Sequence, residues 1–131
     1  MFVLVLETGD EVVAKLTAFA TSRSLAGSHF TGIGAFRDVV LGYFAWEDKQ
    51  YRRIALSEQV EVLSLVGDIT GGRDGPALHA HVVVGRADGT AHGGHLIDAV
   101  VRPTLEVMLT ESPRHLVRRH DETSGLALIK L

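Results

Sequence analysis

The sequence contains no cysteine, so disulfide bonds and thiolate metal ligands are excluded. Any metal site in this chain must therefore use histidine, carboxylate or water ligands. The absence of cysteine also fits a protein that works in a reducing compartment.

Long hydrophobic runs are missing as well. Residues 1–7, MFVLVLE, have no basic leader and reach an acidic residue after a short apolar run. No run approaches the roughly 20 apolar residues that a membrane-spanning helix needs. We therefore expect a soluble, cytoplasmic protein. At 131 residues and 46% hydrophobic composition, the chain has the size of a single domain over residues 1–131.

Basic residues are not in excess. The chain has 13 Lys and Arg against 16 Asp and Glu, a net charge of −3. Sequence-independent DNA binding depends on an excess of basic side chains that face phosphates. The charge balance therefore argues against a protein that binds DNA by itself.

The first elements predicted are a strand and a helix. The apolar residues 2–6 predict a strand buried on both faces. Thr8 and Glu11 have the spacing of a capping box, and apolar residues at helical spacing follow. We expect one amphipathic helix of about four turns, at about residues 10–25, closing near Gly27 and packed on a sheet.

The remainder is rich in β-formers. We expect strands at residues 29–36, 39–46, 51–56, 59–66, 97–109 and 126–131, with a loop at residues 71–76. In the first of these, Gly32 and Gly34 favour a bulge over a nucleotide-binding loop, because no third glycine or Lys-Ser/Thr follows. A short basic cluster is expected at a solvated edge; it consists of Arg114, His115, Arg118, Arg119 and His120. The predicted fold class is α+β, with one antiparallel-rich sheet and one principal helix.

Four of the seven histidines lie within residues 79–95. Residues 78–85, LHAHVVVG, predict a strand in which His79 and His81 share the face opposite the apolar residues. A three-residue hairpin loop at residues 87–89 would pair His81 with His95, within reach of His79. A four-residue loop, or a bulge at residues 93–94, would bring His92 to that face instead.

Three converging imidazoles can bind one divalent metal and leave a fourth position for water. We predict that His79, His81 and His95 bind such an ion, with zinc the first choice and iron, nickel or manganese as alternatives. Glu61 and Asp98 are the candidate carboxylates that would orient the rings. The alternative is that the histidines only make hydrogen bonds within the strands or across a subunit interface.

Six segments in order resemble the PPC (plants and prokaryotes conserved) domain. These are GIGAF at 32–36, LGY at 41–43, VLSLVG at 62–67, LHAH at 78–81, GGHL at 93–96 and DETSGL at 121–126. The resemblance implies a trimer-forming α/β domain, which in plants follows AT-hook segments that bind the DNA minor groove. This chain has no Arg-Gly-Arg-Pro AT-hook, and residues 59–63 read QVEVL where plant members have RFEIL.

The histidine segment also resembles the zinc site of acetolactate decarboxylase, whose three ligands would correspond to His79, His81 and His95. Two functions follow from the two resemblances. The first is a trimeric regulatory, DNA-binding protein with a three-histidine metal site. The alternative is a metal-dependent enzyme that acts on a small molecule. The sequence assigns no catalytic residue, substrate or reaction.

Overall fold

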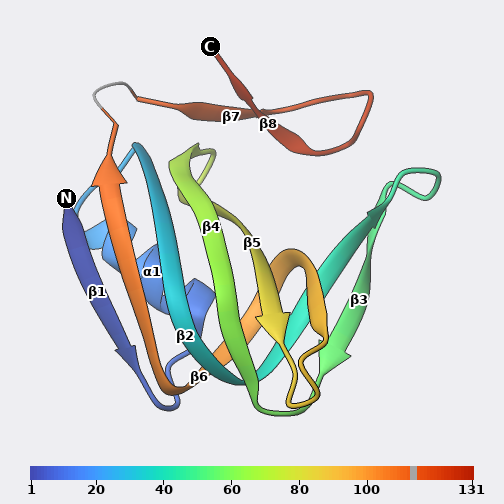
Figure 1. Ribbon diagram of the computed structural model, residues 1–131. Helices are drawn as coiled ribbons and strands as arrows, with labels where there is room; N and C mark the ends of the chain where they lie inside the picture. The colour runs from blue at the N-terminus through green and yellow to red at the C-terminus, as the bar shows by residue number, and fades with distance from the viewer. Residues whose placement is uncertain (113–114) are drawn as a thin grey trace.

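The fold is described by a computed structural model over residues 1–112 and 115–131 (Figure 1). Arg114 of the predicted basic cluster lies outside the described residues. The elements, in order, are β1 (Phe2–Glu7), α1 (Val12–Ser22), β2 (Gly27–Ala45), β3 (Gln50–Leu56), β4 (Val60–Gly72), β5 (Gly75–Gly85), β6 (Ala91–Glu111), β7 (Val117–His120) and β8 (Ala127–Lys130). Over the described residues the protein is therefore mostly β-sheet with one short helix. Among the described strands, only the single-residue pairing of β4 with β7 is parallel.

Four strands form a closed ring. β2 pairs with both β4 and β6, and β5 pairs with the other edge of each. β1 extends the sheet beyond β6, and β3 pairs with the second half of β2. Inward-facing side chains of these strands pack against the apolar side of α1, which contributes Leu16. The largest fully buried side chains from the strands are Phe30, Phe36, Leu41, Leu65, Ile69, Leu105 and Leu109.

The helix begins later than predicted. Its N-cap is Glu11, whose carboxylate accepts hydrogen bonds from the backbone N–H groups of Val13 and Ala14. Thr8 does not cap it, and its hydroxyl donates to the Pro103 carbonyl instead. The reason is that residues 9–11 are already paired with β6, which prevents them from taking a helical conformation.

The helix also ends earlier than predicted. Leu25 donates its backbone N–H to the Ala20 carbonyl and Ser24 donates to Thr21, which is the Schellman pattern. Ser24 takes the left-handed position with φ 52°, where the sequence suggested a glycine. Buried Leu25 then completes the cap by packing into the core. The helix therefore has about three turns, not four.

Predictions for the strands and for one loop also change. β1 is an edge strand with Val3 and Val5 exposed, so within this chain it is buried on one face only. Residues 29–36 and 39–46 belong to one long strand, β2, with a register shift between Gly32 and Gly34 where a bulge was predicted. The loop expected at residues 71–76 is a tight turn, because Gly72 pairs with Gly75 across Arg73 and Asp74.

Candidate metal centre

The hairpin of β5 and β6 has the register predicted from a three-residue loop. Arg86 donates its backbone N–H to the Thr90 carbonyl, and Gly89 takes the left-handed conformation with φ 82°. His81 consequently pairs with His95. His92 pairs with Val84, a buried residue. The structure thus brings His95, and not His92, next to His81.

The three predicted histidines meet on the outer face of the ring. Their ring centroids form a triangle with sides of 5.1 Å for His79 and His81, 5.3 Å for His79 and His95, and 5.6 Å for His81 and His95. One nitrogen from each ring lies within 4.8 Å of the other two. The alternation of strand β5 explains the placement: Ala80 and Val82 point into the core, so His79 and His81 point outward.

His95 is held in its neutral form. Partial burial is the main cause, and the neighbouring His79 and His81 are the smaller causes, that together lower its pKa to about 4. The ring of Tyr51 stacks on it, with centroids 4.6 Å apart. Its Nδ1 is buried and has no hydrogen-bond partner among the described residues. A neutral imidazole with an unpartnered nitrogen is the form that binds a metal ion, so the donor set fits a divalent metal.

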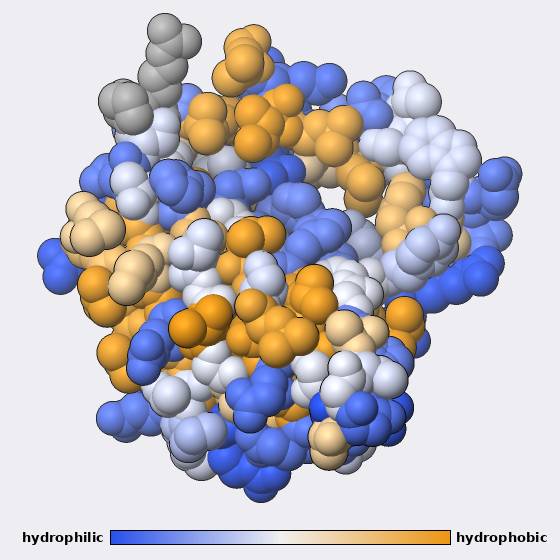
Figure 2. All heavy atoms as spheres, in the orientation of Figure 1, coloured by the Kyte–Doolittle hydropathy of each residue, from blue (hydrophilic) through white to orange (hydrophobic). Residues whose placement is uncertain are grey.

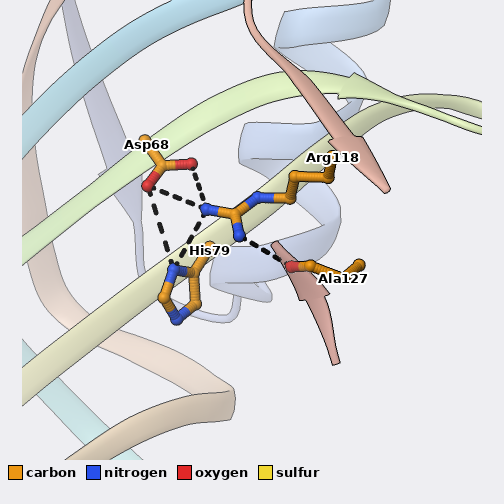
Figure 3. A network of polar contacts seen from close by, with 4 residues as sticks. All are labelled: Asp68, His79, Arg118 and Ala127. Carbon is orange, nitrogen blue, oxygen red and sulfur yellow. Dashed lines mark hydrogen bonds and ion pairs between the residues drawn. The ribbon is translucent and has the colours of Figure 1, made fainter. Parts of the chain in front are cut away.

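His79 has a charged neighbourhood. Its Nδ1 lies 3.8 Å from Oδ2 of Asp68 and 3.2 Å from Nη2 of Arg118 (Figure 3). Burial and the positive charge of Arg118 lower the pKa of His79, while Asp68 raises it. The net direction is downward, so the ring is neutral and does not form an ion pair with Asp68. Instead, Nη2 of Arg118 donates hydrogen bonds to Oδ1 and Oδ2 of Asp68, at 2.8 Å and 3.0 Å.

The predicted carboxylates are not at the site. Glu61 pairs with Gly85, four residues along β5 from His81, which is about 13 Å at the rise of a strand. The carboxylate of Asp98 lies 3.6 Å from Arg53. Asp68 occupies the position expected of these residues, beside His79 on the neighbouring strand β4.

Asp68 and Arg118 are therefore the residues that the sequence analysis missed. The signal for Asp68 was available: a two-residue turn at Arg73 and Asp74 pairs it with His79. Arg118 had no such signal. It was grouped with an exposed basic cluster, but its side chain is only 11% exposed.

A cavity of about 270 Å³ lies next to the histidines. On one side it is bounded by Tyr51, His79 and His95 from the body of the protein, and on the other by Arg118 and residues 126–128 of the hairpin formed by β7 and β8. Figure 2 shows the surface hollowed beneath this C-terminal hairpin. A molecule in the cavity would contact two of the three imidazoles.

Comparison with known proteins decides the family. The family model described as the Plants and Prokaryotes Conserved (PCC) domain matches residues 1–113. The chain belongs to this family. The abbreviation PPC is used for the same domain in related structures, as in the resemblance noted from the sequence, which is thereby confirmed.

Several solved structures share the whole fold. A PPC protein from Pyrococcus horikoshii is 29% identical with a TM-score of 0.93, covering 99% of this chain and 90% of its own. A metal-containing protein from Archaeoglobus fulgidus is 35% identical with a TM-score of 0.91, covering 99% and 92%. A protein from Ralstonia eutropha, named as a proposed DNA-binding protein, is 27% identical with a TM-score of 0.92, covering 98% and 90%.

The second resemblance extends to the fold alone. A Staphylococcus aureus protein of unknown function, similar to α-acetolactate decarboxylase, is 17% identical with a TM-score of 0.61. The match covers 86% of this chain and 52% of that one. Among proteins with curated functions, none matches the PPC chain significantly. Within the described residues, no helix is both long and apolar enough to cross a bilayer.

Proposed function

We propose that this PPC protein binds one divalent metal ion through His79, His81 and His95, with zinc the best chemical fit. The observation that supports the proposal is the triangle of three rings, of which His79 and His95 are held neutral. Zinc accepts three imidazole ligands and keeps a fourth position open for water or substrate. The Archaeoglobus relative named as metal-containing, at 35% identity, supports the same assignment.

A metal-dependent enzyme that acts on a small molecule is the second candidate. It is favoured by the cavity beside His79 and His95, which would place a bound molecule next to the ion. A bound zinc ion would supply an acidified water or a Lewis acid at its open position. The chain's own residues would bind and orient the molecule: Tyr51 along one wall, and the hairpin residues along the other.

We also propose that the protein is a homotrimer. The outer face of the sheet carries exposed apolar side chains on neighbouring strands, in front of β1, β6, β2 and β4 (Figure 2). One row of cross-strand partners runs along this face to the metal site: Val3, Met108, Thr31, Val66, His81 and His95. Closed association of identical chains would cover such a face.

The proposal that the protein is a DNA-binding regulator rests only on the names of its relatives. Relatives from Ralstonia eutropha and Bacteroides thetaiotaomicron are named as proposed DNA-binding proteins. The net charge of −3 argues against direct DNA binding by this chain. We therefore place metal binding ahead of DNA binding in the proposed function.

Elemental analysis combined with thermal unfolding tests the metal site. Protein purified without an affinity tag or chelator should contain one metal ion per chain. Zinc at 100 times its dissociation constant should stabilise the apo protein by about 2.7 kcal/mol. His81→Ala should abolish this stabilisation, whereas His92→Ala, on the same hairpin but outside the triangle, should retain it. Metal-free protein whose melting temperature zinc leaves unchanged would refute the proposal.

A further inference from the structure

Arg118 connects the C-terminal hairpin, here residues 117–130, to the candidate metal centre (Figure 3). Its Nη2 donates to Oδ1 and Oδ2 of Asp68 and lies 3.2 Å from Nδ1 of His79. Its Nη1 donates to the Ala127 carbonyl at 2.9 Å. One guanidinium group thus joins both strands of the hairpin to β4 and β5.

The hairpin has few other attachments to the body. Seven of the eight residues in β7 and β8 are exposed, and Arg118 is the exception. Among the described residues, its backbone reaches β4 only near Gly71, which donates to the Leu116 carbonyl at 2.7 Å. Figure 1 shows the hairpin crossing above the ends of β4 and β5, set apart from the helix. The side chain of Arg118 is therefore the main polar link between this segment and the body, and we call its contacts with Asp68, His79 and Ala127 the Arg118 latch.

A hydrogen bond from Nη2 of Arg118 to Nδ1 of His79 requires one particular tautomer of the imidazole. A guanidinium has five N–H donors and no acceptor. Nδ1 of His79 must therefore be the acceptor and carry a lone pair. A neutral imidazole holds one hydrogen, so the hydrogen of His79 is on Nε2.

Coordination of a metal by His79 is incompatible with this contact, whichever nitrogen is used. If Nδ1 binds the ion, its lone pair is no longer available to Arg118. If Nε2 binds the ion, the hydrogen moves to Nδ1, which then faces Arg118 donor to donor. In both cases the bond between Nη2 and Nδ1 is lost.

We infer that metal binding at His79 breaks the hydrogen bond between Arg118 and His79 and thereby loosens the C-terminal hairpin over the cavity. The inference rests on the metal site proposed above. After Nε2 binds the ion, Nδ1–H would have the Asp68 carboxylate, now 3.8 Å away, as its nearest acceptor. A carboxylate in that position is the usual orienting partner of a metal-bound histidine. Asp68 is then shared between His79 and Arg118, and access to the cavity becomes linked to metal occupancy.

Hydrogen–deuterium exchange of the full chain, with and without zinc chloride, tests the inference. Backbone amides of residues 117–130 should exchange faster with zinc, by roughly the fivefold factor that one net hydrogen bond provides. Amides of residues 79–85 and 91–95 should exchange more slowly, because the ion ties β5 to β6. The two opposite changes within one sample separate local loosening from global destabilisation.

Two variants sharpen the experiment. Arg118→Ala removes the latch, so the hairpin should exchange rapidly in the apo protein and show no further increase with zinc. Because coupling is reciprocal, zinc should bind this variant several-fold more tightly than wild type. Arg119→Ala removes the same charge from an exposed position of β7 and should leave the response to zinc unchanged.

Nitrogen-15 NMR of the histidine rings gives an independent readout. In the apo protein, His79 should show a hydrogen on Nε2 and an unprotonated Nδ1. Stoichiometric zinc binding without faster exchange in residues 117–130 would overturn the inference and leave the metal site intact. Failure of zinc to bind at all would overturn both, and calorimetry of zinc binding distinguishes the two results.

Discussion

The ring of strands and the C-terminal hairpin differ sharply in how they are held. Phe36, Leu65 and Leu105 in the ring are 0% exposed, whereas Leu128 and Ile129 in the hairpin are 37% and 36% exposed. The ring supplies His79, His81 and His95, and the hairpin supplies Arg118 and one wall of the cavity. The candidate site thus combines histidines that a dense core holds in place with a covering segment that few contacts hold. This division suits ligand entry, because segments with few buried apolar contacts open at low cost in free energy.

Substitutions in the two regions should have very different effects on stability. Phe36→Ala should lower the free energy of unfolding by about 3 to 5 kcal/mol, since it leaves a cavity in a fully packed core. Leu128→Ala removes a partly exposed side chain and should cost less than about 1 kcal/mol. Urea unfolding of the two variants measures the difference. Comparable losses would mean that the hairpin is an integral part of the core.

The same division explains what the sequence could predict. The β5–β6 hairpin combines strict alternation with a three-residue Ala87-Asp88-Gly89 loop, so strand geometry alone brings His81 to His95. Local pattern and final structure agree there because the turn determines the register.

Arg118 could not be assigned in that way. Its partners are 50 and 39 residues away in sequence, and no turn geometry connects β7 to β4. The predicted start of the helix was wrong for a related reason. The pairing of residues 9–11 with β6 is a long-range contact that overrides the local capping pattern at Thr8. Contacts between distant segments thus account for the main errors.

Assembly through the outer face of the ring provides a second test of the comparison. Met108 is 57% exposed in the single chain and lies in the apolar row that ends at the histidines. Light scattering of wild type should report three times the 14.1 kDa mass of one chain. Met108→Glu should dissociate the trimer, because it would bury an unpaired charge in the interface. Ile129→Glu in the hairpin should leave the mass unchanged, and a wild-type mass of one chain would contradict the trimer.

The metal-free protein should become less stable in mildly acidic solution because His95 resists protonation in the folded chain. The pKa of His95 is about 4 in the folded chain, below the value of 6.5 that is usual for histidine. Between these values the unfolded chain binds the proton and the folded chain does not, so stability decreases as pH falls from about 6.5 toward 4. The slope is at most about 1.4 kcal/mol per pH unit for one proton. Urea midpoints with chelator present should show a shallower slope for His95→Gln, and equal slopes would contradict the neutral state of His95.

The smallest effect is expected for DNA binding by the basic residues of the C-terminal hairpin. The hairpin carries Arg118, Arg119 and His120 of the basic cluster, but the charge of Arg118 is balanced by Asp68 at 2.8 Å. His120 lies 3.8 Å from Glu122, so little unbalanced positive charge remains on this segment to face phosphates. At about 150 mM salt, fluorescence anisotropy should detect no sub-micromolar binding to an AT-rich duplex, since such binding needs several phosphate contacts. Arg119→Ala should leave the titration unchanged, and tight binding lost in that variant would place the DNA contact on the hairpin and reverse the order of the two functions.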